Sequence, residues 1–281
     1  MTKRVVFYAL LVKLCLRYYR APPTIQVMKF KNLIDCLQEI APLELAEEWD
    51  NPGLLIEPLK NRDIKKVLLT VDLTEAVARE AVQKRVELIV TYHPLFFGGF
   101  QRLEKSNPQA CSAMRLIQKE IAVYSPHTAL DAAPGGVNDW LADALGDGDL
   151  YCSESGGARI VELAAPVKLP TLGKRGKESL RLRHIKTATA NDKPIRTVAL
   201  CAGAGISALR DIQADCFLTG EMKHHDVLGA VERGTSVILC GHTETERGYL
   251  KILRRRLLAE TEKTVDVLIA KEDAAPLKVS S

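Results

Sequence analysis

The feature that most constrains the fold is a regular alternation of short apolar runs with longer stretches of helical periodicity. The predicted strands are 67–71, 88–91, 121–124, 159–163, 197–201, 216–219, 237–240 and 265–270. The predicted helices are 30–40, 75–85, 109–119, 137–145, 206–211, 224–233 and 245–260. Strands that alternate with helices form parallel or mixed sheets with helices on their faces. The sequence therefore predicts an α/β fold.

The order of the elements occurs twice, which indicates an internal duplication. In the first half, strand–helix–strand ends near His93, and a further strand leads into the H-T-x-x-D motif at 127–131. In the second half, the same order ends near Glu221, and a further strand leads into the H-T-x-x-E motif at 242–246. We therefore expect two similar halves. The expected ranges are 28–150 for the first half, 151–194 for a connecting segment, 195–270 for the second half and 271–281 for a tail.

Basic charge is concentrated at the start of the chain. The 281 residues carry a formal net charge of +4, but residues 1–27 hold five basic residues and no acidic one, which leaves −1 for residues 28–281. This basic leader predicts either a mitochondrial-type presequence or a dispensable extension upstream of Met28. Its apolar run at 5–12 is too short to cross a bilayer, so we expect no membrane partner. The charge of the remaining chain gives no reason to expect nucleic acid as the main partner.

Histidines gather where the predicted strands end. His93, His127 and His242 stand just beyond a strand, and His224 follows one less directly. Ligands of open α/β sheets bind at the carboxyl ends of the strands. The carboxylates near these histidines are Asp131, Glu221 and Glu246. Because no C-x-x-C pair occurs, we expect a divalent metal site with nitrogen and oxygen ligands. Such ligands suit zinc, iron, manganese, cobalt or nickel, and the sequence does not choose among them.

The spacing within the two H-T motifs favours hydrolytic chemistry. At the start of a helix, His242 and Glu246 would face one way, as would His127 and Asp131. A carboxylate can bridge two metal ions about 3.5–4 Å apart, which is a geometry that activates water for hydrolysis. A serine nucleophile has less support, because no G-x-S-x-G motif occurs.

Two further patterns leave alternatives open. Residues 203–208 form G-x-G-x-x-A after a predicted strand, which is typical either of dinucleotide binding or of a tight turn with positive φ. The basic stretch 174–183 is suited either to phosphate contacts or to a solvated surface between the halves. It lacks the interleaved aromatic residues that stack on bases.

Several motifs occur in a fixed order along the chain. They are Trp49-Asp50-Asn51, Tyr92-His93-Pro94, Ser125 to Asp131, Leu218 to Glu221 with His224-His225-Asp226, and Gly241-His242 with Thr245 to Gly248. Together, over Met28 to about Ala270, they resemble the Nif-three-like family, whose bacterial members are often labelled GTP cyclohydrolase type two. The resemblance implies a duplicated α/β fold with mixed sheets and a dinuclear metal site between the halves. It also implies a homo-oligomer, a toroidal hexamer built as a trimer of dimers.

A set of metal ligands follows from the resemblance. Carried over onto this chain, the ligands are His93, Asp131, His242 and Glu246, and His127 lies nearby. Tyr92 stands where many members have a first histidine, and this feature resembles the eukaryotic branch of the family. A neutral phenol is a poorer ligand than imidazole. The number of metal ions, one or two, therefore stays open.

Two functions follow from these expectations. The first is a divalent-metal-dependent hydrolase, of cyclohydrolase or phosphoesterase type, that acts on a small nucleotide-like substrate, with Glu221 or His225 as the acid/base. The alternative is a non-enzymatic interaction protein, such as a transcriptional co-regulator or a metal chaperone, that uses the oligomeric ring as a scaffold for a transcription-related protein partner. Cytoplasm, mitochondrion and nucleus all stay open as compartments.

Overall fold

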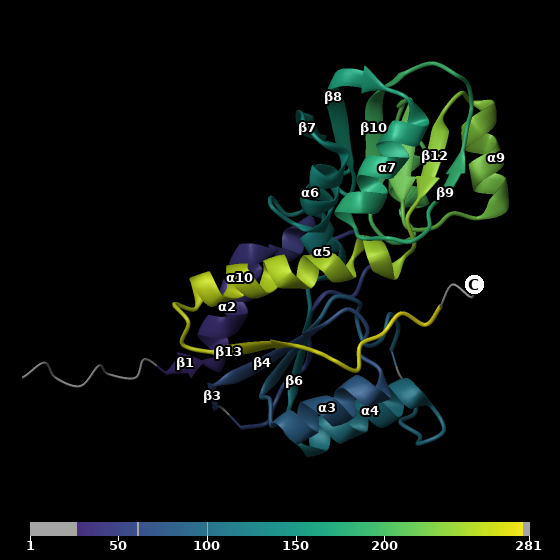
Figure 1. Cartoon of the computed structure of the whole chain (residues 1–281). Helices are drawn as coiled ribbons and strands as arrows, with labels where there is room; N and C mark the ends of the chain where they lie inside the picture. Colours follow the sequence, from purple (N-terminus) through teal and green to yellow (C-terminus); the bar gives the residue numbers. More distant parts are fainter. Residues whose placement is uncertain (1–26, 61, 100, 278–281) are drawn as a thin grey trace, which may run out of the picture.

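The computed structural model of the chain describes residues 27–60, 62–99 and 101–277, arranged as two large sheets with helices between and around them (Figure 1). Apart from Val27, the predicted leader lies outside the described residues. None of the helices within the described ranges is long and apolar enough to cross a membrane.

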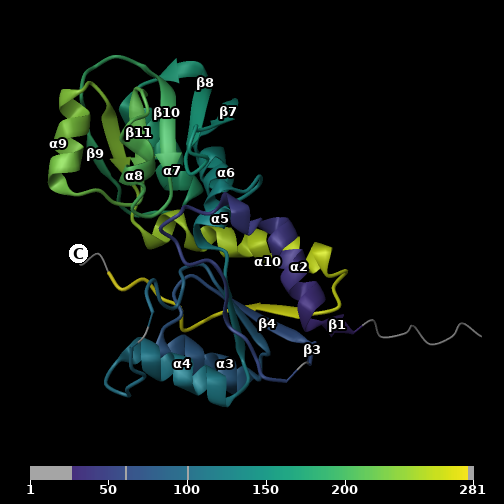
Figure 2. The same cartoon turned by 180° about the vertical axis from the view of Figure 1, so that it is seen from behind.

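The first half is built on a five-stranded mixed sheet. Its strands, in spatial order, are β13 (Asp266–Ile269), β4 (Lys66–Thr70), β5 (Leu88–Thr91), β6 (Ala122–Ser125) and β2 (Gly53–Ile56). All neighbours are parallel except β2, which runs antiparallel to β6. The helices α3 (Glu75–Lys84) and α4 (Pro108–Gln118) cover one face, and α2 (Phe30–Ile40) and α10 (Leu250–Glu260) cover the other (Figures 1 and 2).

The second half is built on a six-stranded mixed sheet. Its strands, in spatial order, are β7 (Gly148–Cys152), β8 (Arg159–Val167), β10 (Ile195–Cys201), β11 (Cys216–Thr219), β12 (Ser236–Leu239) and β9 (Lys186–Ala188). Its helices are α6 (Val137–Ala142) and α7 (Leu169–Ser179) on the inner face, and α8 (Ile206–Leu209) and α9 (His224–Glu232) on the outer face. A separate two-stranded sheet pairs β1 (Met28–Lys29) with β3 (Asp63–Ile64).

The predicted duplication is visible in the topology. The unit β4–α3–β5–α4–β6 of the first half recurs as β10–α8–β11–α9–β12, and each unit has three parallel strands. In each half an additional strand that precedes the unit in the chain, β2 or β9, pairs antiparallel with the third strand of the unit. The internally duplicated α/β fold predicted from the sequence is therefore confirmed.

One hydrophobic core joins the two halves. Along β4, Val67 and Leu69 face this shared core, whereas Leu68 between them faces the α3–α4 layer. This alternation is the two-residue period of a strand that is covered on both faces. The shared core continues through Leu253 of α10 to Leu218 of β11. The halves are consequently packed against one another through buried side chains.

The sheets divide the chain differently from the ranges expected from the sequence. The segment 151–194 was expected to be a connection, but it supplies β8, α7 and β9 to the second half. Strand β13, expected in the second half, pairs in parallel with β4 of the first. The predicted helix 245–260 is an α-helix only from Leu250, because two 3₁₀ turns, η3 (Thr243–Thr245) and η4 (Arg247–Tyr249), precede it. Two further 3₁₀ turns are η1 (Leu43–Leu45) and η2 (Asp143–Leu145).

Candidate metal centre

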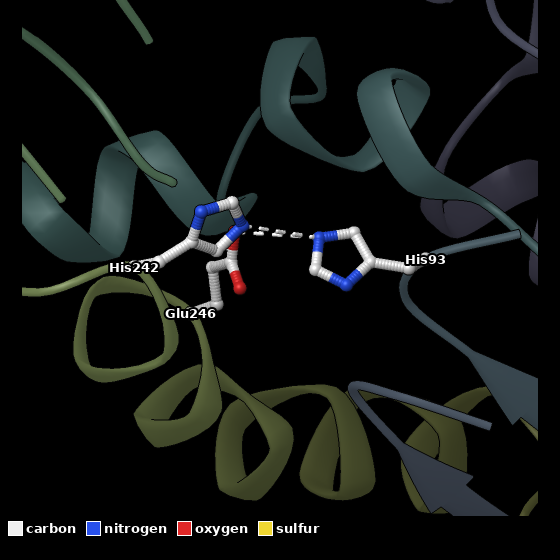
Figure 3. A group of neighbouring side chains, drawn as sticks. All are labelled: His93, His242 and Glu246. Atoms are coloured by element: carbon white, nitrogen blue, oxygen red, sulfur yellow. Dashed lines mark hydrogen bonds and ion pairs between the residues drawn. The ribbon is translucent and has the colours of Figure 1, made fainter. Parts of the chain in front are cut away.

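Three predicted ligands converge where the two halves meet. His93 follows β5 of the first half, and His242 and Glu246 flank the η3 turn after β12 of the second half (Figure 3). Oε1 of Glu246 lies 3.1 Å from Nε2 of His242 and 3.5 Å from Nε2 of His93. The two Nε2 atoms are themselves 3.5 Å apart. All three ligand atoms therefore lie within 4.8 Å of one another, a spacing that allows them to share one metal ion.

Carboxylates hold the far side of both imidazole rings. Nδ1 of His93 is 2.9 Å from Oδ1 of Asp72, and Nδ1 of His242 is 2.9 Å from Oε1 of Glu221. A carboxylate on Nδ1 fixes the ring orientation and directs Nε2 toward a metal, as is usual for histidine ligands. Asp72 was not predicted as a site residue, and it follows β4 at the same edge of the sheet as His93. The sequence signal that could have found it is its place just after a buried strand.

The two histidines lie in a strongly acidic environment. Burial lowers the pKa of His93, but its hydrogen bonds to Asp72 and Glu246 outweigh burial and raise the pKa to about 10. Hydrogen bonding to Glu246 raises the pKa of His242 to about 9, against the opposing effect of burial. For Glu246, burial is likewise outweighed by the two histidines, which hold its pKa below the ordinary value. The site thus stabilises positive charge beside Glu246. A bound divalent cation would supply such a charge.

Two local features fit a metal ion at this position. Glu246 is only 3% exposed, and its Oε2 is buried without a hydrogen-bond partner in the described part of the chain. A buried carboxylate oxygen without a partner is costly unless a cation or a donor satisfies it. Gly203, at φ +60°, packs directly on the ligands, since a Cβ there would lie 2.5 Å from Oε1 of Glu246. The donor set of two imidazoles and one carboxylate suits the divalent transition metals.

Asp131, the fourth predicted ligand, is bonded to Tyr92 instead. The Tyr92 hydroxyl donates a hydrogen bond of 2.6 Å to Oδ1 of Asp131, and both side chains are buried. Burial raises the pKa of Asp131 to about 8, although the hydrogen bond from Tyr92 opposes the shift. Burial also raises the pKa of Tyr92 well above its ordinary value, so the phenol stays neutral at pH 7. The structure therefore brings together three of the four predicted ligands and pairs the fourth, Asp131, with Tyr92.

A second histidine–carboxylate pair adjoins the three ligands. Nδ1 of His127 lies 2.7 Å from Oδ1 of Asp50, whose other oxygen accepts hydrogen bonds from the backbone amide and the hydroxyl of Thr128. The ring of His127 meets that of His93 edge to face at a centroid distance of 5.4 Å. His127 also has a φ of +30°, which is uncommon for a residue with a Cβ. Asp50 thus fixes the orientation of His127, a role that the sequence did not reveal.

Comparison with known proteins identifies the family. A family model described as Duf34/NIF3 (NGG1p interacting factor 3) matches residues 28–276. The chain belongs to the DUF34/NIF3 family. It is 43% identical over 255 residues to the "Protein NIF3 homolog" of Schizosaccharomyces pombe, a match that covers 83% of this chain and 92% of that protein. It is 38% identical over 279 residues to the "NGG1-interacting factor 3" of Saccharomyces cerevisiae, covering 89% and 96%.

A solved structure shows the same fold as this NIF3-family chain. The crystal structure of a Bacillus cereus protein related to NIF3 matches with a TM-score of 0.78 at 19% sequence identity, covering 91% of this chain and 100% of that one. At this identity the match establishes the fold alone. The family model and the two yeast relatives confirm the family resemblance inferred from the ordered motifs.

Of the two acid/base residues predicted for this NIF3-family chain, one lies at the site and the other does not. Glu221 follows β11, holds His242 and is 55% exposed on its side chain, so it faces the solvent side of the site. His225 lies at the exposed start of α9, where its ring contacts that of His224. It is not among the described residues that line the cavity at the three ligands. The structure therefore brings Glu221 to the site but leaves His225 outside it.

The ligands open into a large cavity between the two halves, of about 2270 Å³. His93 and His242 line it, as does Phe97 from the loop after β5. Side chains from the segment after α7 and from α10 also line it. A cavity of this size between the halves can admit a small molecule to the three ligands.

Proposed function

We propose that this NIF3-family chain binds a divalent metal ion through His93, His242 and Glu246 and hydrolyses a small substrate there, with cyclohydrolase or phosphoesterase chemistry. The observation that carries the proposal is the buried Glu246 carboxylate: its Oε2 lacks a hydrogen-bond partner among the described residues, while its Oε1 lies 3.1 Å and 3.5 Å from the two imidazole nitrogens. Zinc, iron, manganese, cobalt and nickel all suit this donor set. The Tyr92–Asp131 hydrogen bond favours one firmly held ion over two.

The surrounding residues suit this chemistry. A divalent ion at the site supplies Lewis-acid activation of water or of a substrate oxygen. Asp72 and Glu221 keep the two ligand rings oriented, so that their Nε2 atoms face each other. Asp50 holds Nδ1 of His127, which leaves Nε2 of that ring able to take up or release a proton. Glu221 is the second acid/base candidate, because its side chain is exposed to the cavity.

Metal analysis tests the proposal. We expect about one metal ion per chain in freshly purified wild-type protein, and a loss of that metal in His242→Ala. His225→Ala is the matched control, because His225 is exposed and lies outside the cavity. A wild-type metal content near zero, or equal contents in the wild type and His242→Ala, would contradict the proposal. Turnover of a substrate library should then depend on added metal and disappear in Glu246→Gln.

A second candidate function is protein binding, as a transcriptional co-regulator or metal chaperone on a ring-shaped oligomer. The observation that favours it is the name of the Saccharomyces cerevisiae relative, an NGG1-interacting factor. Metal-dependent turnover that Glu246→Gln abolishes would count against a purely non-enzymatic role. Sedimentation analysis tests the expected hexamer, and a monomeric mass at micromolar concentration would refute the scaffold.

A further inference from the structure

The segment after β13, residues 270–277, lies at the junction of the two halves. It leaves the edge of the first sheet and reaches the cavity, which Ala275, Pro276 and Leu277 line (Figure 1). Within this segment, the side chain of Asp273 is only 2% exposed. A carboxylate is rarely buried so deeply unless hydrogen bonds or cations satisfy its oxygens. The partners of Asp273 therefore indicate what this segment holds in place.

On the side of the first half, Asp273 holds the chain just after β4. Its Oδ2 accepts a hydrogen bond of 2.8 Å from the backbone amide of Val71, and its Oδ1 accepts one of 3.4 Å from the amide of Asp72. Asp72 in turn places its Oδ1 2.9 Å from Nδ1 of His93. The amide of His93 also donates to the carbonyl of Val71, at 3.0 Å. Asp273 thus fixes the two residues that hold the first ligand.

On the side of the second half, Asp273 holds Arg247, the residue that follows Glu246. Nη2 of Arg247 donates to Oδ1 of Asp273 at 2.9 Å, and Nη1 donates to the Asp273 carbonyl. Glu246 stands between the η3 and η4 turns, with a φ of −121° and a ψ of −50°. Because Glu246 joins two separate turns and does not lie within one helix, the anchored side chain of Arg247 limits how far its backbone can move.

We propose that Asp273 is a positioning residue for the metal centre, which joins the strand end that orients His93 to the residue beside Glu246. The inference rests on the proposed function for the metal ion itself. Through Asp72 and Arg247, one buried carboxylate holds ligands of both halves at the spacing that a shared ion requires. Metal affinity therefore depends on a residue that is not itself a ligand.

A second buried carboxylate holds the same segment without reaching the ligands. Glu80 of α3 is 5% exposed, accepts hydrogen bonds from the backbone amides at 271–272 and pairs with Lys84. Its partners in the described part of the chain do not include Asp72 or Arg247. Glu80→Gln is therefore the matched control, because it loosens the segment and leaves the contacts of Asp273 in place.

Zinc titration of the full chain against a chromophoric chelator tests the proposal, with Tm measured on the same metal-free samples. We expect Asp273→Asn to lower zinc affinity by about tenfold, the lower end of the range for groups that orient metal ligands. Glu80→Gln should stay within about twofold of the wild-type affinity, although both variants should lower the Tm. Should Asp273→Asn fail to fold, Arg247→Gln tests the same contact from the other side and should also lower affinity about tenfold.

A double variant distinguishes one shared contact from two independent effects. If Asp273 and Arg247 act through one contact, D273N/R247Q should bind zinc no more than about twofold more weakly than Asp273→Asn alone. Losses that multiply to about a hundredfold would overturn the inference. Cobalt(II) bound by Asp273→Asn should also have an altered visible absorption, because its ligands are displaced. Cobalt(II) bound by Glu80→Gln should have the wild-type spectrum.

The outcomes separate this inference from the proposed function. A wild-type chain that takes up none of the divalent transition metals refutes the proposed function, and the positioning role with it. Zinc binding by the wild type with equal affinities in Asp273→Asn and Glu80→Gln refutes the positioning role alone. An unchanged cobalt spectrum in Asp273→Asn does so as well, because a purely structural residue would change only the Tm. A chain with the expected order of zinc affinities but no turnover retains this inference and refutes the hydrolase.

Discussion

Replacing Gly203 by alanine should weaken metal binding without altering any ligand. The added Cβ would lie 2.5 Å from Oε1 of Glu246 and 3.1 Å from Nε2 of His242. Real Cβ atoms do not approach oxygen so closely, so the Glu246 carboxylate must move by several tenths of an ångström. Loss of a group that orients a metal ligand lowers metal affinity by about 10- to 100-fold. A displaced ligand has a similar effect, because a metal site needs its ligands held within about 0.5 Å. We expect the same range for Gly203→Ala.

Gly156→Ala separates this steric effect from backbone strain. Gly203 has a φ of +60° and Gly156 a φ of +78°, so alanine at either position costs about 1–2 kcal/mol of strain. A Cβ on Gly156, however, meets no atom within 4 Å. Strain of this size should lower the Tm of either variant by about 2–8 °C in the metal-free state. Only Gly203→Ala should also lose metal affinity.

The assay is competitive titration of zinc against a chromophoric chelator, with Tm measured on the same metal-free samples. Equal zinc affinities in Gly203→Ala and Gly156→Ala would refute the reasoning, because the clash with Glu246 would then have no effect on the ligands. A Glu246→Gln sample that keeps Gly203 sets the lower limit of affinity. An affinity of Gly203→Ala at that limit would mean that the carboxylate is displaced from the site entirely.

Three further predictions concern other parts of the molecule. Tyr92→His should raise the metal content per chain, because it frees Asp131 from the phenol and adds an imidazole; an unchanged content by elemental analysis would show that no second site is latent. Burial opposes ionisation of Glu80, but hydrogen bonds from the backbone amides at 271–272 hold its pKa below the ordinary value. Its stabilising effect is therefore present above about pH 4 and lost as pH falls through the folded-state pKa, so the Tm difference between wild type and Glu80→Gln should shrink in acid and not stay constant. Deleting residues 1–27 should change the cellular location if the leader is a presequence, and fluorescence microscopy of tagged chains checks this; an unchanged location makes it a dispensable extension.

The sequence predicts where the helices and strands of this fold lie better than it predicts which strands pair with each other. The apolar spacing over Phe30–Ile40 predicts the helix with the bounds that the structure has. The run at 265–270 predicts a strand as well, but its pattern says nothing of which strand it joins, and it pairs with β4 of the other half. The contribution of segment 151–194 to the second sheet was missed for a different reason. Its many lysines and arginines obscure Leu169 and Leu172, which are buried in the shared core.

The candidate site shows the same limit. The positions of histidines and carboxylates after predicted strands predicted a metal site, and the family resemblance implied His93, His242 and Glu246 as ligands. The structure brings the ligand atoms of these three residues together. The pairing of His127 with Asp50 spans 77 positions, so no local pattern could indicate it. For the glycine-rich turn, the structure shows the features of a tight turn. Its first glycine has the positive φ of a tight turn and packs on Glu246, and the helix that follows has only four residues.

The pairing of β13 with β4 has a consequence for synthesis of the protein. Asp266 lies beside Lys66, so the edge of the first sheet stays open until two hundred further residues have left the ribosome. Contacts between residues so far apart in the sequence form slowly during folding. Strand edges stay unpaired until these contacts have formed. His242 and Glu246 also emerge well after His93. A nascent chain that ends before residue 242 therefore has neither a complete first sheet nor a complete set of predicted ligands, and both are acquired only near the end of translation.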